Sequence, residues 1–464
     1  MTPQPDRLTR VPSGDTLTVT GRSLIPIAFN CQPDIKASFE RFKSEEARYD
    51  FFYVSRDSLT PQVRTSNAFN EYREPDEENR TTAVTRDRSH GVEFAVEKRF
   101  FDTTELDLAV GYQTEVNSDI GNYPYVTGRL RYPLWASREK LGRASEDIFR
   151  RNELDDAQLA YIQQVRSRLQ DMLFKFYLAI QQERQLEYLR EWLEDLEDLA
   201  RSVDAIEGRD VATDRRRIQA EIARKTSDIR NLTGRKEIDD ERFKASCGLP
   251  FHVQVELIDD DFNPFVGATH EELLRASMET DPEIATLRNA LRNAEVQLDL
   301  ARRGKWDIAL TLAGASQIEG RGTLEGTSDW SASAGFEVSA VDSRVTGSLI
   351  RQAQASIARF RQAIAARENA IFVDTLEPVI RIETLGKSRE ELTNNLPRYI
   401  EDYENGVSEF LRGALNIDDL LKRRETLIDQ QYEIANLAWL VGANVAELCS
   451  ATGKFFDLLD AEAE

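Results

Sequence analysis

Hydrophobic residues recur along the chain with two different periods, and each period predicts one kind of element. Between Arg143 and Glu207, apolar residues recur every three or four positions, and glycine and proline are absent. This pattern predicts one helix of roughly 65 residues, about 95 Å long at 1.5 Å per residue. A turn at Gly208 then predicts a returning helix that ends near residues 248–250, where Gly-Leu-Pro is a typical C-terminal stop.

The period is two in four shorter segments that lie before the long helical stretches. Apolar and polar residues alternate over residues 92–97, 106–113, 307–312 and 330–338. Such alternation predicts strands with one apolar and one polar face, as in a sheet that separates two environments. A soluble sandwich with a buried core is the alternative interpretation of the strands alone.

Six glycines indicate an internal repeat. They occur in two sets with the same spacings of 66 and 40 residues, and the sets are offset by 205: Gly142, Gly208 and Gly248, then Gly347, Gly413 and Gly453. Upstream, residues 33–35 match residues 282–284 at an offset of 249. The change of offset predicts two copies of one unit, the first with an insertion of about 44 residues before Gly142.

The repeat and the two periods divide the chain into six segments. In chain order they are an N-terminal segment with the first helix (1–62), strands of repeat 1 with the insertion (63–135), a long helical hairpin (136–250), a linker with the first helix of repeat 2 (251–305), strands of repeat 2 (306–341), and a second helical hairpin with the C-terminus (342–464). Pro378 and Pro397 lie in the descending helix of the second hairpin, which we therefore expect to be bent or divided.

Composition and motifs exclude several classes of function. Acidic residues outnumber basic ones by 82 to 60, so nucleic acid is not an expected partner, because phosphate binding needs a basic face. The three cysteines, Cys31, Cys247 and Cys449, do not suggest a disulfide framework, and the three histidines lack metal-ligand spacing. Without a catalytic triad, phosphate loop or dinucleotide motif, we expect neither an enzyme nor a cofactor.

Other features bear on a membrane location. No run of 18 apolar residues predicts a transmembrane helix, and the first 30 residues do not resemble a signal peptide. Cys31 follows an apolar run that faintly resembles a lipoprotein site, but the run is short and broken by Pro26. Four to six strands cannot close a membrane barrel, which needs at least about eight, so several chains would share one barrel. Four aromatic residues at strand ends are candidates for the membrane interface, or else ordinary buried side chains: Tyr132, Trp135, Trp306 and Trp330.

There are four motifs, at residues 24–35, 132–142, 413–421 and 445–453, and in this order they resemble the TolC-like outer-membrane efflux proteins over residues 15–455. Residues 24–35 resemble the opening helix of that family, with Gln32 in place of the common asparagine. Residues 132–135 followed by Gly142 resemble the last strand and its exit into the long helix. Residues 413–421 resemble the turn at the tunnel tip, and residues 445–453 resemble the end of the last helix.

The resemblance implies a homotrimer with a mixed α and β fold. It implies a twelve-stranded transmembrane β-barrel shared by three protomers in outer-membrane lipid, and an α-helical barrel in the periplasm. It also implies a passive exit duct for small molecules or polypeptides, in a tripartite efflux or type I secretion system. An inner-membrane pump and a periplasmic adaptor would be its partners. A soluble coiled-coil scaffold is the alternative, although it does not explain strands before each long helix.

The two helix turns are the candidate gate of such a duct. An aspartate lies six residues after each turn glycine: Asp214 after Gly208, and Asp419, with Asp418 beside it, after Gly413. Basic residues follow at 215–217 and 422–424, so opposite charges on neighbouring helices would hold a closed state. Helix capping is the alternative role for the aspartates.

Overall fold

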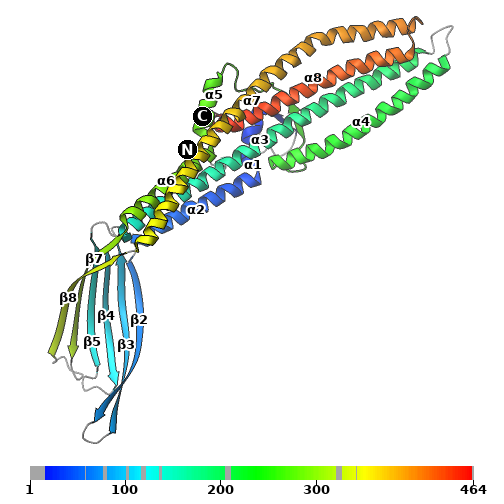
Figure 1. Ribbon diagram of the computed structural model, residues 1–464. Coiled ribbons are helices and arrows are strands. Elements are labelled where there is room, and N and C mark those ends of the chain that lie inside the picture. Colours follow the sequence, from blue (N-terminus) through cyan, green and yellow to red (C-terminus); the bar gives the residue numbers. More distant parts are fainter. Residues whose placement is uncertain are drawn as a thin grey trace. The chain divides into compact units, whose positions relative to one another are not determined.

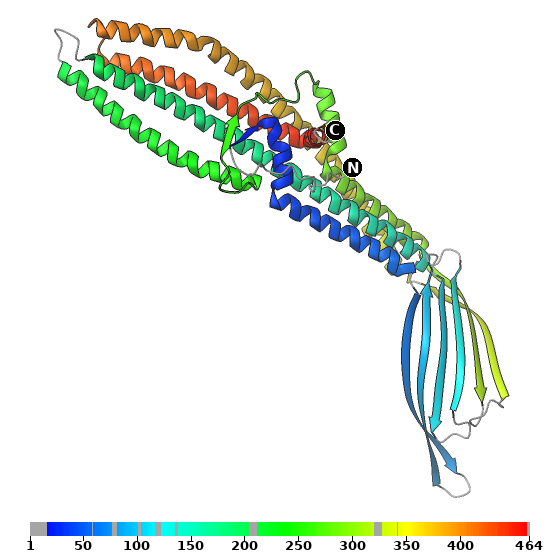
Figure 2. The same ribbon diagram turned by 180° about the vertical axis from the view of Figure 1, so that it is seen from behind.

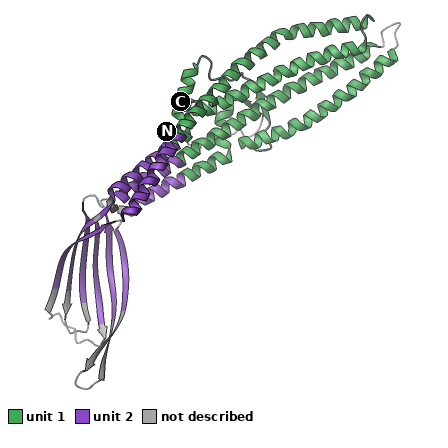
Figure 3. Cartoon of the chain, viewed as in Figure 1, with its two compact units in different colours: residues 1–42, 157–286, 364–464 green, residues 43–156, 287–363 purple. Residues whose placement is uncertain are grey.

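The computed structural model describes residues 16–57, 59–76, 81–100, 104–116, 122–134, 138–203, 211–319, 327–340 and 342–461. They form two compact units, shown in different colours in Figure 3. Unit 1 comprises residues 1–42, 157–286 and 364–464, and unit 2 comprises residues 43–156 and 287–363. Each unit is built from segments that are distant in the sequence.

Unit 2 contains a six-stranded antiparallel sheet (Figure 1). Its spatial order is β2-β3-β4-β5-β7-β8. The strands are β2 (Leu59–Asp76), β3 (Thr81–Arg99), β4 (Glu105–Val116), β5 (Asn122–Pro133), β7 (Trp306–Glu319) and β8 (Thr327–Ala340). All four segments with a period of two are strands, so this prediction is confirmed.

The two faces of this sheet differ in polarity. In the register, Val96 pairs with Leu108, Leu130 pairs with Leu312, and Leu312 pairs with Ala334, so these side chains share one face. The large exposed hydrophobic residues of the strands lie on this apolar face, among them Phe94, Val110 and Phe336. The opposite face is polar and carries ion pairs such as Arg64–Glu93 (3.2 Å). The predicted separation of polarity is therefore present across the sheet.

The long helices of unit 1 lie side by side, as Figures 1 and 2 both show. They are α4 (Val211–Cys247), α8 (Ile417–Thr452), and the unit 1 parts of α3 (Arg138–Val203) and α7 (Ser343–Leu411). The predicted long helix is confirmed, because α3 spans 66 residues without a break. Its buried stripe, which includes Leu169, Leu173 and Phe176, follows the predicted spacing.

Both predicted proline-led helices are present, α2 (Pro33–Asp57) and α6 (Pro282–Arg303). A side chain before each proline caps the helix: the Gln32 side-chain oxygen accepts from the backbone N–H of Ile35 (3.3 Å), and Asp281 Oδ1 accepts from that of Ile284 (2.7 Å). Glutamine at position 32 thus makes a cap that asparagine usually makes.

Shorter elements complete unit 1. Strands β1 (Leu17–Thr20) and β6 (Val255–Ile258) pair in parallel, and the helices are α1 (Gly21–Cys31), α5 (His270–Thr280) and α9 (Lys454–Ala461). Gly248 ends α4 with φ +70°, and its Cα lies so close to the Cys31 carbonyl that a Cβ would meet that oxygen at 2.3 Å. Only glycine fits this stop, which explains the Gly-Leu-Pro signal.

The two prolines do not divide α7. The helix runs unbroken from Ser343 to Leu411 through Pro378 and Pro397, and Figures 1 and 2 show it curving within unit 1. Division was one of two expectations, and it is wrong. Val379 is buried against Leu273 and Leu448, and this packing holds the helix past the first proline.

Helix α8 is long and apolar enough to cross a membrane by length and composition alone. Half of its most apolar window is buried inside the structure, as in the core helix of a soluble protein. Gly442, in this window, lies against the Tyr177 ring, where a Cβ would meet ring atoms at 2.4–2.6 Å. Close packing on α3 therefore accounts for the apolar character of α8.

Candidate functional site at the helix ends of unit 1

The candidate gate lies where the two helical hairpins of unit 1 turn. Helix α3 ends at Val203 and α4 begins at Val211, and Gly208 lies outside the described residues. Helix α7 ends at Leu411 and α8 begins at Ile417. Gly413 (φ +77°) ends α7 in a Schellman motif, in which Gly413 N–H donates to the Phe410 carbonyl and Ala414 N–H to the Glu409 carbonyl, each at 2.9 Å.

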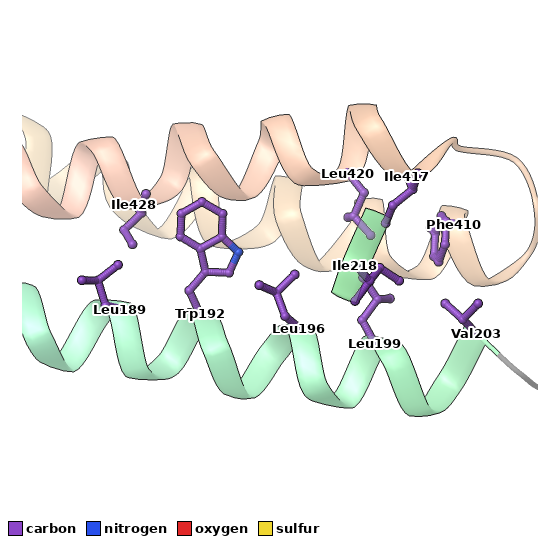
Figure 4. Close-up of a cluster of buried hydrophobic side chains, with 10 residues drawn as sticks. All are labelled: Leu189, Trp192, Leu196, Leu199, Val203, Ile218, Phe410, Ile417, Leu420 and Ile428. Atoms are coloured by element: carbon purple, nitrogen blue, oxygen red, sulfur yellow. The ribbon is translucent and has the colours of Figure 1, made fainter. Parts of the chain in front are cut away.

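A hydrophobic cluster joins the four helices at these ends (Figure 4). Figure 4 shows the α3 side chains pointing toward α8. In the same view, Ile218 of α4 lies beside Leu199, and Phe410 of α7 lies beside Val203. Its ten buried residues, called the helix-end cluster here, are Leu189, Trp192, Leu196, Leu199, Val203, Ile218, Phe410, Ile417, Leu420 and Ile428. Burial of these side chains fixes the four helix ends relative to one another.

Charged side chains of α8 surround the helix-end cluster and contact the other helices. Asp418 forms an ion pair with Arg217 of α4. Arg423 donates to the backbone carbonyl of Asp402 (3.1 Å) and pairs with Glu409 (3.2 Å), both on α7. A Cβ at Gly406 would meet the Arg423 side chain at 3.0 Å, so this glycine lets Arg423 lie flat on α7. Opposite charges on neighbouring helices are therefore in contact, as the gate hypothesis requires.

Arg424 is the most buried charge of the site, with 4% of its surface exposed. It forms an ion pair with Asp195 of α3 (2.8 Å), and its guanidinium lies 5.1 Å from the centre of the Tyr403 ring of α7. Burial raises the pKa of the Asp195 carboxyl, although the positive charge of Arg424 opposes this shift. Burial also raises the pKa of the Tyr403 hydroxyl, which stays protonated. The Arg424 side chain thus links α8 to both α3 and α7.

Lys225 of α4 makes a comparable contact with α3. Its ammonium lies 3.5 Å from the centre of the Trp192 ring, and Glu221 lies 3.5 Å from the same nitrogen. Burial lowers the pKa of Lys225, while Glu221 favours the charged form. The contact is a cation–π interaction on the edge of the helix-end cluster.

The two remaining candidate aspartates lie in first turns of helices. Asp214 is buried in the first turn of α4. At the start of α8, the Asn416 side chain accepts from the Asp419 N–H (2.8 Å) and donates to the Asp419 carboxylate (2.5 Å). A negative charge is favourable at a helix N-terminus, so both positions also fit the helix-capping alternative.

The structure brings together most of the site residues named from the sequence and adds others. Asp214, Asp418, Asp419 and Gly413 lie at the same helix ends, whereas sequence reasoning missed Asp195, Tyr403, Trp192 and Lys225. Arg424 was among the basic residues expected at the gate, and its position between Leu420 and Ile428 in the buried stripe of α8 was a signal that its charge is buried. A charge within an apolar stripe requires a buried partner.

The candidate membrane-interface aromatics belong to the sheet of unit 2. Tyr132, Trp306 and Trp330 are exposed, and the register places all three on the apolar face. Tyr132 and Trp306 lie near the ends of the strands that adjoin the helices, and Trp330 lies toward the opposite ends. Trp135 lies outside the described residues. In the described part of the chain, no group of three or more His, Cys, Asp or Glu side chains could hold a metal ion.

Comparison with known proteins identifies the fold. Neither a protein-family model nor a curated protein sequence matches the chain. Solved structures do. The Vibrio cholerae outer membrane protein VceC matches with a TM-score of 0.66 and 12% identity, over 93% of this chain and 96% of its own.

Two further channels match with slightly lower TM-scores. The open state of the Neisseria gonorrhoeae MtrE outer membrane channel gives a TM-score of 0.64 and 15% identity, over 93% of this chain and 88% of its own. The Campylobacter jejuni CmeC outer membrane channel gives a TM-score of 0.63 and 13% identity, over 93% of this chain and 85% of its own. The resemblance found in the sequence is thus confirmed at the level of the fold, and the chain has the fold of the TolC-like outer-membrane efflux channels.

Proposed function

We propose that this protein is an outer-membrane channel that serves as the passive exit duct of a tripartite efflux or type I secretion system. The sheet of unit 2 is the observation that carries the proposal. Its apolar face exposes large side chains that a water-soluble sheet would bury, among them Phe336 at 73% and Trp330 at 78%. An exposed apolar face of this extent suits contact with lipid, and the ion-paired face suits a water-filled lumen.

The exposed aromatics agree with the thickness of a membrane. Trp330 pairs with Ser316, which lies ten residues along β7 from Trp306. Ten residues of a strand extend about 33 Å, and a barrel tilt of about 40° leaves about 25 Å along the membrane normal. The apolar band of an outer-membrane barrel is about 25 Å tall, so Trp306 and Tyr132 suit one interface and Trp330 suits the other.

Assembly and partners follow from the same proposal. One chain supplies six strands, fewer than the eight or so that close a membrane barrel, so several copies would share one barrel. Because the fold resembles that of the TolC-like channels, we propose that these copies form a homotrimer in outer-membrane lipid. The long helices would form a tube in the periplasm that meets an adaptor protein and an inner-membrane pump. The duct itself would do no chemistry, and small molecules or polypeptides are its proposed cargo.

The helix ends of unit 1 are the proposed gate. Arg217–Asp418, Arg423–Glu409 and Arg424–Asp195 are contacts between neighbouring helices, and each requires those helices to stay close. Breaking a few such contacts would favour an open arrangement of the helix ends. Asp214, Asp419, Gly208 and Gly413 remain proposed parts of this gate.

A pair of lysine substitutions on opposite faces of the sheet tests the membrane location. Val110→Lys places a charge on the apolar face, where a lysine that faces lipid costs about 2 to 4 kcal/mol at the bilayer midplane and less toward the interfaces. Thr127→Lys on the neighbouring strand faces the polar side and is the matched control. We expect heat-modifiable trimers in the outer membrane from the wild type and the control, and strongly reduced trimer from Val110→Lys.

The alternative function gives a different result. If the wild type is recovered without detergent in the soluble fraction and both lysine variants behave like it, a soluble coiled-coil scaffold replaces the channel. Equal tolerance of both substitutions within outer-membrane trimers would show that the apolar face does not meet lipid.

A further inference from the structure

We propose that three copies of this chain close a barrel of eighteen strands, in which β8 of each copy pairs with β2 of the next. The inference rests on the proposed outer-membrane trimer. The family resemblance implies twelve strands, which is four for each protomer, but the sheet of this chain has six. The question is whether all six strands belong to the wall of the barrel.

The six strands form one continuous ladder. Strands β2 and β3 pair from Leu59–Lys98 to Asp76–Thr81, and β3 and β4 pair from Arg99–Glu105 to Arg88–Val116. These registers are at least as long as those among β4, β5 and β7. Each strand has 12 to 19 residues, and about 9 to 11 suffice to cross a membrane.

The first two strands carry the same two faces as the other four. Val63 of β2 and Phe94 of β3 are exposed on the apolar face, and they are cross-strand partners. On the polar face, Arg64 of β2 contacts Glu93 of β3 (3.2 Å) and Asp107 of β4 (3.4 Å). The Tyr125 hydroxyl of β5 donates to Glu93 (2.9 Å). A hairpin folded away from the wall would break this polar network.

The direction of the edge strands allows identical copies to join. Within the described residues, β2 and β8 are the two edges of the sheet, and an open edge cannot lie in lipid. Five successive antiparallel pairings separate them, so β2 and β8 run in opposite directions. A β8–β2 junction between copies is therefore antiparallel, and repeating it around a ring closes the sheet without an unmatched pair.

Each edge strand, β2 or β8, is thus covered by another copy of this chain. The total number of strands then sets the diameter of the barrel. Barrel diameter grows roughly linearly with the number of strands, so eighteen strands give about 1.5 times the diameter of twelve. Barrels of 16 to 18 strands enclose an aqueous channel. The insertion in the first repeat would therefore widen the outer-membrane opening.

Cysteine pairs across the proposed junction test the arrangement. Val63→Cys in β2 is combined in one chain with a cysteine at Ala332, Ala334, Phe336 or Val338 in β8, all on the apolar face. Five interstrand spacings separate β2 and β8 within a chain, about 24 Å, so a disulfide can form only between copies. After oxidation of membranes, we expect at least one of the four pairs to give covalently linked trimers on denaturing gels.

Two controls define the background. Arg64→Cys with the same β8 positions points to the opposite face and should not cross-link. The wild type retains Cys31, Cys247 and Cys449 in unit 1, and the last two are buried. Oxidised wild type therefore shows any links that do not involve the sheet.

Three results would overturn the proposal. The first is cross-linking of β8 to Val110→Cys in β4, since this places the β2–β3 hairpin outside a twelve-stranded wall. The second is an intact trimer in which none of the Val63 pairs cross-links. The third is a native mass of two chains of 52.9 kDa, because two copies would close twelve strands. Absence of the wild type from the outer membrane refutes instead the proposed function on which the inference rests.

Discussion

Replacing Arg424 by methionine should loosen the helix ends of unit 1 while leaving the sheet of unit 2 unchanged. Methionine is apolar and flexible enough to fill the space of the arginine stem, so the change chiefly removes the charge. It removes the ion pair with Asp195 and the contact with the Tyr403 ring at once. These are contacts of α8 with α3 and α7.

The magnitude follows from the burial of each partner. A hydrogen bond to a charged group contributes about 1.5 to 3 kcal/mol, and a partly desolvated cation–π contact contributes about 0.5 to 2 kcal/mol. Two effects reduce this sum. The Asp195 side chain is 40% exposed and can be hydrated again, and the variant no longer buries a guanidinium. We therefore expect a net loss of about 1 to 3 kcal/mol, a factor of about 5 to 150 in the equilibrium for local opening.

Hydrogen exchange of the assembled protein in detergent measures this loss where it occurs. Peptides covering residues 189–203 and 417–431 should exchange about 5 to 150 times faster in Arg424→Met, and peptides from the sheet should be unchanged. Arg242→Met is the matched control, because the Arg242 side chain is 72% exposed and its ion pair is with Asp239 on the same helix. Wild-type exchange at the helix ends of Arg424→Met would refute the reasoning, and faster exchange everywhere would indicate general misfolding.

A double-mutant cycle separates the ion pair from the ring contact. Asp195→Asn keeps the shape of the side chain but removes its charge. If the pair contributes, the exchange effects of Asp195→Asn and Arg424→Met are smaller together than their sum. Strict additivity would assign the whole effect of Arg424 to its packing on Tyr403.

Four further predictions concern the same molecule. Gly413→Ala should destabilise the turn by about 1 to 2 kcal/mol, because the φ of Gly413 is +77°. Gly386→Ala within α7 should instead stabilise the helix by about 0.5 to 1 kcal/mol. An added Cβ has open space at both positions, so thermal unfolding of the two variants compares the backbone effects alone. Asp418→Asn, Asp214→Ala and Asp419→Ala should raise single-channel conductance without loss of trimer if these aspartates hold the gate, and a lower thermal stability with unchanged conductance would identify them as caps. With 82 acidic and 60 basic residues, the pore should prefer cations in planar bilayers, and anion preference would place the excess charge outside the lumen. Burial raises the pKa of Asp195, so above about pH 4 the folded protein binds more protons than the unfolded chain. The free energy of unfolding should therefore fall as the pH rises from about 4 through the raised pKa of Asp195, and Asp195→Asn should flatten this pH dependence.

Periodicity and glycine spacing predicted the elements but not their contacts. The 3.6-residue stripe of α3 and the alternation in β4 are local properties of the sequence, and both elements appear where they were predicted. The Gly248 stop was readable because only glycine adopts its backbone conformation easily. The internal repeat, and the division of the chain that follows from it, stay predictions.

Contacts between helices could not be derived in the same way. Asp195 and Arg424 are distant in the sequence, and nothing local to either shows that α3 and α8 lie side by side in that register. The sequence predicted that Pro378 would bend or divide α7. The helix is curved but not divided, and Val379, next to this proline, is buried against other elements of unit 1. The cost of a proline inside a helix is a local property, whereas the packing that keeps α7 continuous comes from residues distant in the sequence.

The two units separate two properties of the proposed duct, its width at the membrane and its closure. In the proposed trimer, strands β2 and β3 would be part of the barrel wall, and an opening lined by eighteen strands would be wide enough for an aqueous channel. The helix-end cluster and its ion pairs belong to unit 1 and include no residue of β2 or β3. In this proposal, closure would take place at the helix ends, because a wide barrel would not supply it. Additional strands in the sheet would then widen the exit of the proposed duct without altering its proposed gate.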